Sequence, residues 1–349
     1  MWDNVRSARA IAPLDRAAFE QDIYPAGQPV VLKGQVASWP IVALAGGSDR
    51  AFCDALAAQA NTQPTQLWAG PSTIGGRYGF AEGTGAENFE RKLAPLADIC
   101  ALLLRATSEP APPGMFAGAI NLADHVPGLL PKVPMPLLGE ERHRLTSLWI
   151  GNPGRTAAHW DLPDNLSCVV RGQRRYLLFP PDQIGNLYLG PIDRTLAGQP
   201  ISMVDCDAPD LARFPRYAEA LAHAQQAILE PGDVLFIPSM WFHHVVSPAP
   251  IGAQVNFWWR ANDAATMSPQ STLLHALLTL RDLPANERSA WRAFFDHYIF
   301  DTPDAATAHF TPGTAGVLGP MTRDLELQLA ERLVKELAGW HNRRLTETP

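Results

Sequence analysis

Two short stretches of the sequence combine histidine and aspartate in a way that suits a metal ion. The first is Thr156-Ala157-Ala158-His159-Trp160-Asp161. In an extended strand, residues two apart point to the same face, so His159 and Asp161 can converge on one ion. Alone this pattern is weak, because it arises often by chance and a single copy is more commonly a hydrogen-bonded pair at the surface.

The second stretch is the run Glu230 to Pro238, followed by Trp241-Phe242-His243-His244. Its Pro-Gly-Asp turn precedes a short apolar strand, after which the chain delivers two histidines. One histidine can complete the metal site and the other can support it or face the substrate. Two imidazoles and one carboxylate form a facial triad, which leaves positions open on iron(II). A structural zinc site would usually use four Cys or His ligands in a closed shell, whereas only three are offered here.

The elements around these stretches fall into three parts. Residues 1–110 mix helix and strand signals. Residues 111–260 are short β-branched and aromatic runs split by Pro, Gly, Asn and Asp, which is typical of an antiparallel sandwich or barrel. Residues 261–349 are helical in pattern. We therefore predict a mainly β fold with α elements: N-terminal α/β elements packed on a β core, then a C-terminal helical region.

The last predicted helix, Thr322 to Trp340, carries one apolar stripe. Leu325, Leu329, Leu333 and Leu337 recur at a spacing of four and so share one face. That face must be buried. It either packs on the β core, as amphipathic helices usually do, or pairs with its copy in a homodimer.

Composition limits the partners and the compartment. The net charge of -7 gives no general attraction to nucleic acid or to anionic membranes, so neither is expected as a partner. The four cysteines are far apart, which predicts reduced thiols rather than a disulfide framework. The N-terminus has no signal-peptide core, and no stretch approaches about 18 uninterrupted apolar residues. A cytoplasmic protein is the expectation.

Several motifs from about residue 111 to 260 occur in an order and with gaps that resemble the JmjC or cupin-like-8 family of 2-oxoglutarate oxygenases. Within that family the sequence is most similar to the asparaginyl hydroxylase that modifies hypoxia-inducible factor. The resemblance implies a double-stranded β-helix, or jelly-roll, core of cupin type. The motifs that carry it are Gly151-Asn152-Pro153-Gly154, Thr156-x-x-His159-x-Asp161, Asn165, Phe179-Pro180-Pro181-Asp182-Gln183, Leu187-Tyr188, Arg213-Phe214-Pro215, Pro231-Gly232-Asp233-Val234-Leu235, Trp241-Phe242-His243-His244 and Val255-Asn256-Phe257-Trp258.

The resemblance also implies roles for single residues. The first histidine after the Pro-Gly-Asp strand is the ligand in this family, which selects His243 over His244. Thr156 would donate its hydroxyl to the 5-carboxylate of 2-oxoglutarate. The remaining implied contacts are Asn165 and Asn256 near the 1-carboxylate and Trp258 as a pocket wall.

Arg174 stands where many relatives have lysine, and it would pair with the 5-carboxylate. A guanidinium can bind a carboxylate bidentately, although the pocket must be reshaped around its longer side chain. The plainer alternative is an exposed strand residue. Arg175 should point to the opposite face. Relatives often add a hydroxyl from an upstream strand, and none can be aligned within Phe116 to Leu122.

Three further tryptophans are placed by burial tendency and strand alternation. Trp149 and Trp259 are expected in the core, and Trp160 on the other face of the sheet from its ligand neighbours. The loops at residues 70–85 and 185–210 should border the pocket and set specificity.

The function implied is an iron(II)- and 2-oxoglutarate-dependent dioxygenase that hydroxylates a protein side chain or a small molecule. Its cosubstrates are 2-oxoglutarate and dioxygen, and its co-products are succinate and carbon dioxide. The main alternative is a metal-binding cupin-like sensor or scaffold without 2-oxoglutarate turnover. N-methyl-lysine demethylation ranks lower, because no reader domain or basic surface accompanies the core. The sequence does not identify the substrate.

Overall fold

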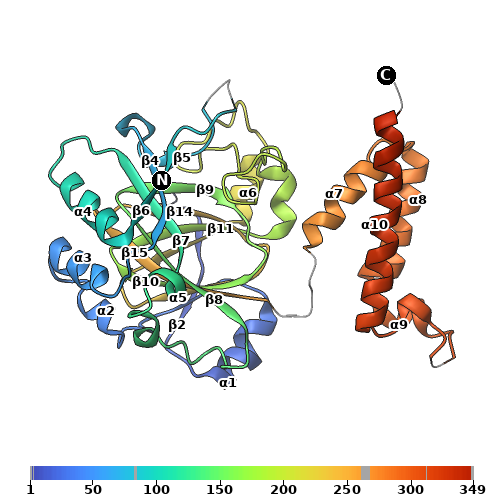
Figure 1. The fold of residues 1–349 in the computed structure, drawn as a ribbon, viewed down its shortest axis with the longest axis horizontal. Helices are drawn as coiled ribbons and strands as arrows, with labels where there is room; N and C mark the ends of the chain where they lie inside the picture. The colour runs from blue at the N-terminus through green and yellow to red at the C-terminus, as the bar shows by residue number, and fades with distance from the viewer. Residues whose placement is uncertain (1, 3, 82–84, 261–267, 312, 347–349) are drawn as a thin grey trace. The chain divides into compact units, whose positions relative to one another are not determined.

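The computed structural model describes residues 2, 4–81, 85–260, 268–311 and 313–346. The chain divides into two compact units, Met1–Asp263 and Ala264–Pro349 (Figure 1). The first unit thus contains both the predicted N-terminal part, 1–110, and the predicted core, 111–260. The second begins close to the start of the predicted helical region.

Two mixed β-sheets form the body of the first unit (Figure 1). In order across the sheet, the described strands of the six-stranded sheet are β1 (Arg6–Ser7), β12 (Gln225–Leu229), β11 (Arg174–Phe179), β14 (Phe242–Ser247), β9 (Gly154–His159) and β5 (Arg77–Tyr78). Those of the nine-stranded sheet are β2 (Arg9–Ile11), β3 (Val30–Leu32), β13 (Val234–Ile237), β10 (Asp164–Arg171), β15 (Gly252–Trp259), β8 (Arg144–Gly151), β7 (Gly114–Asn121), β4 (Pro64–Gly70) and β6 (Glu90–Pro95). The predicted mainly β, cupin-like fold is confirmed.

Strands from the N-terminal part are hydrogen-bonded into these sheets. In the nine-stranded sheet, β3 pairs with β13 toward one edge, and β4 pairs with β7 toward the other. On the six-stranded sheet, β1 pairs with β12 and β5 with β9. The N-terminal part therefore extends the sheets themselves, in addition to contributing helices.

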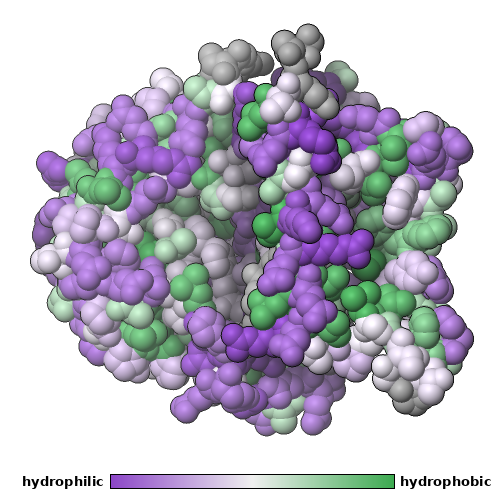
Figure 2. All heavy atoms as spheres, turned by 45° about the vertical axis from the view of Figure 1, so that its right-hand side comes forward, coloured by the Kyte–Doolittle hydropathy of each residue, from purple (hydrophilic) through white to green (hydrophobic). Residues whose placement is uncertain are grey.

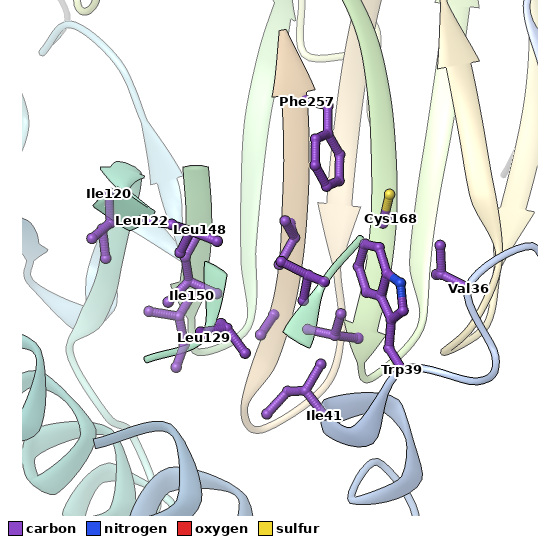
Figure 3. Packing of buried hydrophobic residues seen from close by; sticks show 14 of the residues in the cluster. Val36, Trp39, Ile41, Ile120, Leu122, Leu129, Leu148, Ile150, Cys168 and Phe257 are labelled. Atoms are coloured by element: carbon purple, nitrogen blue, oxygen red, sulfur yellow. The ribbon is translucent and has the colours of Figure 1, made fainter. Parts of the chain in front are cut away.

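Helices cover the outer face of the nine-stranded sheet. Side chains of α3 and α4 join one apolar cluster with outward-facing residues of β8, β10 and β15. Figure 3 shows Leu148, Ile150 and Phe257 in this cluster with Trp39 and Ile41. Ser48 caps α3, since its hydroxyl accepts a hydrogen bond from the Ala51 amide. The α-helices of this unit are α1 (Arg16–Ala18), α2 (Pro40–Ala43), α3 (Asp49–Ala57), α4 (Leu96–Ala106), α5 (Leu122–His125) and α6 (Tyr217–His223).

Alternation along the strands separates an apolar face from a polar one. On β10, Leu166 and Cys168 join the helix-covered core, whereas Asn165 and Ser167 point between the two sheets. On β15, Phe257 joins the core and Asn256 points inward. Because successive side chains alternate, one register fixes all of these directions together. The result is a polar pocket enclosed between two sheets.

The second unit consists of helices with very little burial. They are α7 (Pro269–Thr279), α8 (Ala285–Phe295), α9 (Pro303–Thr307) and α10 (Arg323–Thr346). Among the side chains of this unit that the structure describes, Ala306 is the only buried one. Figure 2 shows one face of the whole molecule, on which hydrophobic residues (green) lie among hydrophilic ones (purple). No helix in the described parts of the chain has the length and apolarity to span a membrane.

The predicted leucine stripe lies on α10, which extends beyond the predicted end at Trp340. Leu325 and Leu329 are partly buried, whereas Leu333 and Leu337 are each 47% exposed. The charges of this helix favour self-pairing. Acidic residues lie in its first turn and Arg343 and Arg344 in its last, so two antiparallel copies would place opposite charges together. Pairing of two copies through the C-terminal helices remains a prediction.

We predict that the full chain is a dimer and that Leu333→Asp with Leu337→Asp makes it a monomer. A charge placed in an apolar helix interface is desolvated without a partner, which disfavours association. Light scattering coupled to size-exclusion chromatography would measure the mass. Leu93→Asp, at a 74% exposed residue of the first unit, is the control and should remain dimeric. A monomeric wild-type chain would show instead that the stripe does not pair with a copy.

Candidate metal centre and its pocket

The three predicted metal ligands lie together at one end of the polar pocket. In the antiparallel pair of β9 and β14, His243 is directly opposite His159, and Asp161 follows the end of β9. One ligand atom from each residue lies within 4.8 Å of the others. The Nε2 atom of His243 is 3.6 Å from Oδ2 of Asp161. It is the only such group of His, Cys, Asp or Glu side chains found among the described residues.

Backbone carbonyls orient both imidazoles for ligation. Nδ1 of His159 is 2.9 Å from the carbonyl oxygen of Ala157, and Nδ1 of His243 is 3.1 Å from that of Trp241. Since a carbonyl only accepts, each Nδ1 carries the proton and each Nε2 offers its lone pair to the cluster. Burial, together with the neighbouring His159, lowers the pKa of His243 to about 4. His243 is therefore neutral at physiological pH, as a ligand must be.

The adjacent histidine points the other way. Nε2 of His244 lies 3.3 Å from Oδ2 of Asp207, and the Trp2 ring meets the His244 ring edge-on at 5.5 Å between centroids. Alternation along β14 separates the two side chains. The geometry thus places His243, and not His244, in the cluster.

Arg174 occupies the same pocket, in a setting that is unfavourable for a cation. Only 4% of it is exposed, and burial lowers its pKa. Its side chain makes no hydrogen bond or ion pair with any residue that the structure describes, and its Nε is buried without an acceptor. A buried charge without a partner is costly. The neighbouring Arg175 points to the opposite face, where its guanidinium lies 5.0 Å from the Trp2 ring centre.

All eight residues that sequence analysis selected line this one pocket. Nδ2 of Asn256 donates to Oδ1 of Asn165 at 3.0 Å, while Oδ1 of Asn256 has no donor in the described structure. The Nε1 of Trp258 is likewise without an acceptor. These orphaned groups leave polar atoms available to a ligand. The eight residues are Thr156, His159, Asp161, Asn165, Arg174, His243, Asn256 and Trp258.

The tryptophan assignments hold in part. Trp259 is in the core and Trp160 is in the apolar cluster on the outer face of the six-stranded sheet, as predicted. The assignment of Trp149 to the core is wrong, because it lines the pocket and packs edge-on against Trp258, with 5.7 Å between ring centroids. On β8, Trp149 shares the inward face with Ser147, whose hydroxyl accepts from Trp149 Nε1 at 3.1 Å.

A hydroxyl that the sequence did not indicate lines the same recess as Arg174. Tyr78, on the short strand β5, lies opposite Thr156 in the parallel pair with β9. It is buried, which raises its pKa, and its hydroxyl has no partner in the described structure. Tyr78, Thr156 and Arg174 line one recess. Nothing in the local sequence marks this two-residue strand, so only the sheet pairing reveals the residue.

A second missed group is a hydrogen-bonded chain across the pocket. The Tyr176 hydroxyl donates to Oε1 of Gln254 at 2.7 Å and lies 2.8 Å from the Ser167 hydroxyl. The three residues come from β11, β15 and β10 and therefore join the two sheets. Their inward position follows from the same alternation that places Asn165 and Asn256.

Comparisons with known proteins show the family of the chain. Residues 16–265 match the family described as the cupin-like domain. A tRNA wybutosine-synthesizing protein 5 from Danio rerio is 29% identical over 262 residues, which cover 71% of this chain and 73% of that protein. The human protein of that name is 32% identical over 185 residues, 48% of this chain and 56% of that protein. Lysine-specific demethylase JMJ31 from Arabidopsis thaliana is 35% identical over 122 residues, 35% of this chain and only 22% of that protein.

We predict that His243→Ala weakens binding of Co(II), a spectroscopic substitute for Fe(II), by more than about 100-fold. Losing a ligand should exceed the 10- to 100-fold loss typical of changing a ligand's outer partner. His244→Ala is the matched control and should keep the affinity within about tenfold of wild type. Absorbance titration against a competing chelator measures both. Equal losses in the two variants would contradict the geometry.

Proposed function

The chain belongs to the cupin-like, JmjC-type domain family, and from this premise we propose that it is an iron(II)- and 2-oxoglutarate-dependent dioxygenase. In this proposal it hydroxylates a small molecule or a protein side chain. One observation carries the proposal: a single pocket holds the His-Asp-His cluster together with a buried guanidinium that has no counter-charge among the described residues. A metal-chelating dicarboxylate would bind a metal ion at the cluster with one end and pair with the guanidinium through its other carboxylate.

The donor set fits iron(II). His159, Asp161 and His243 supply two imidazole nitrogens and a carboxylate, the set typical of iron(II) oxygenases with open positions. A closed structural zinc site would need a fourth ligand, and the described residues offer no fourth His, Cys, Asp or Glu side chain to this cluster.

The rest of the pocket fits 2-oxoglutarate. Arg174 can take the 5-carboxylate bidentately, and the Thr156 and Tyr78 hydroxyls line the same recess. Asn165 and Asn256 are on the pocket wall, and in the proposal they face the 1-carboxylate, as the family resemblance implies. The buried Arg174 charge would then be neutralised only when the cosubstrate is bound, which favours binding of an anion over an empty pocket.

Bound iron(II) with 2-oxoglutarate and dioxygen supplies oxidative decarboxylation to succinate and carbon dioxide, coupled to insertion of one oxygen atom into a substrate C–H bond. The chain's residues hold and orient these groups. His159 and His243 are kept in one tautomer by their carbonyl partners. The Trp149 and Trp258 rings wall the pocket, where they would limit the entry of water. This chemistry requires no protein nucleophile or general base.

The relatives do not select the substrate. Their names refer to tRNA modification in one case and to lysine demethylation in another, and the demethylase is covered over only 22% of its length. We therefore propose simple hydroxylation as the reaction, with demethylation of N-methyl-lysine as a less favoured alternative. Because the net charge of the chain is -7, we do not expect nucleic acid as a partner. A cytoplasmic location remains part of the proposal, and the four cysteines are buried and unpaired, as a reducing compartment permits.

We predict that Arg174→Met lowers the affinity for 2-oxoglutarate by at least about 100-fold, because two charge-assisted hydrogen bonds of roughly 1.5–3 kcal/mol each are lost. The ligand-free variant should be at least as stable as wild type, since a buried unpaired cation has been removed. Calorimetric unfolding with Mn(II), with and without 2-oxoglutarate, measures both. Arg175→Met is the control and should keep the 2-oxoglutarate response. A ligand-free Arg174→Met protein that is less stable would indicate a structural role instead.

We predict slow formation of succinate and carbon dioxide when the full chain is given Fe(II), ascorbate, dioxygen and 2-oxoglutarate. Asp161→Ala should abolish it, because the carboxylate ligand is lost. Mass spectrometry of succinate provides the measurement. If wild-type protein binds metal and 2-oxoglutarate but forms no succinate, the sensor or scaffold alternative replaces the enzyme.

A further inference from the structure

A cleft of about 420 Å³ lies next to the metal pocket, and its described lining is rich in arginine. We infer that this arginine cleft binds an anionic group, phosphate or carboxylate, of a small-molecule substrate. The inference rests on the proposed function and names the substrate class for the same site. The residues on which it depends are Arg77, Arg194, Arg213, Phe80, Ile201 and Met203.

The charged side chains in the described lining of the cleft are all cationic. Three arginines line it, and no Asp or Glu belongs to its described lining. The whole chain carries a net charge of -7, so composition alone would not gather cations here. Guanidinium groups bind carboxylate and phosphate in the same bidentate way. This cleft therefore selects for an oxyanion.

Neighbouring residues hold two of the arginines in place. Nη1 of Arg77 is 3.3 Å from Oδ2 of Asp205, outside the cleft lining, which offsets part of its charge. The Arg213 guanidinium lies 5.0 Å from the Phe214 ring centre, where the ring supports its plane. Arg213 and Phe214 belong to a motif that sequence analysis noted without assigning a role.

Arg194 lines the cleft beside a glycine at residue 85. Gly85 has φ +66°, and a Cβ there would lie 3.4 Å from Nη1 of Arg194. The left-handed backbone favours glycine at this position, and the Arg194 guanidinium lies at ordinary contact distance from it. Arg194 makes no ion pair with any residue of the described ranges. Its charge is the one most available to a ligand.

The other walls are apolar. Phe80, Ile201 and Met203 line the cleft, and Met203 is 42% exposed. An apolar wall beside a cationic rim suits a ligand that has an apolar body and one anionic end. These residues come from the two loop regions, 70–85 and 185–210, that sequence analysis expected to set specificity.

The position of the cleft connects it to the proposed chemistry. Tyr78 lines both the cleft and the recess that contains Thr156 and Arg174. Ala157, also in the cleft lining, lies on β9 between Thr156 and the ligand His159. A molecule anchored in the cleft is thus held next to the metal centre.

The volume of the cleft and the negative electrostatic field of the chain favour a small-molecule ligand. A volume of 420 Å³ is within the usual range of small-molecule sites, about 300–1,000 Å³. A long polyanion would meet the negative field of the chain beyond the cleft. An isolated anionic group avoids that repulsion.

The test compares phenyl phosphate, benzoate and benzyl alcohol as probes of the metal-free full chain by isothermal titration calorimetry. We expect the two anions to bind at least about tenfold more tightly than the neutral alcohol, and their ranking distinguishes phosphate from carboxylate. The variant Arg194→Gln with Arg213→Gln should lose that preference. The control, Arg50→Gln with Arg105→Gln, removes the same charge from exposed helix residues of the first unit and should retain it.

Three results would overturn the inference: equal binding of all three probes, unchanged binding in the Arg194 and Arg213 variant, or tighter binding of a single-stranded oligonucleotide than of either anion. The probes are used without metal, so the outcome does not depend on succinate formation. A failed inference and a failed enzyme proposal can therefore be told apart.

Discussion

The antiparallel pairing of β9 with β14 places His243 opposite His159, and the rest of the pocket is arranged around this register. A shift by one residue would turn His244 inward and His243 outward, because side chains alternate along a strand. The register is held on both sides: β14 also pairs with β11, and β9 also pairs with β5. The same pairings bring Arg174, Tyr78 and Thr156 to one recess. Backbone hydrogen bonding between strands therefore determines the chemistry that the pocket can perform.

In the nine-stranded sheet, one face contributes to stability and the other to the proposed function. The outward side chains of β8, β10 and β15 pack under helices in a continuous apolar cluster. The inward side chains of the same strands carry hydroxyls, amides and indoles, several without partners in the described structure. Burying Arg174 without a counter-charge opposes folding. Such an unfavourable group is tolerated where a ligand can relieve it, which is why this residue carries the functional proposal.

The two compact units differ in how they bury apolar surface. The first has extensive apolar clusters on both outer sheet faces, whereas the second buries only Ala306 among its described side chains. Exposed Leu, Phe and Trp side chains in a helical unit require association with another surface to be shielded from water. The acidic start and basic end of α10 offer a way for two copies to provide it.

Much of the site could be predicted from local sequence and family resemblance. The spacing of His159 and Asp161 and the Pro-Gly-Asp strand before His243 are local patterns. The remaining five predicted residues followed from motif order, and all eight line one pocket. The β core and the helical end were also visible, because strand and helix periodicities differ within short windows.

Only the tertiary structure revealed Tyr78, the inward face of Trp149, the lack of a counter-charge at Arg174, and the arginine cleft. Each of these depends on which strands or loops lie side by side. Tyr78 reaches the pocket through a parallel pairing between segments far apart in the sequence, and Arg194 meets Gly85 through loop packing. Local patterns determine which face a side chain shares with its neighbours along the chain. Long-range pairing of strands determines which residues from other segments lie opposite it.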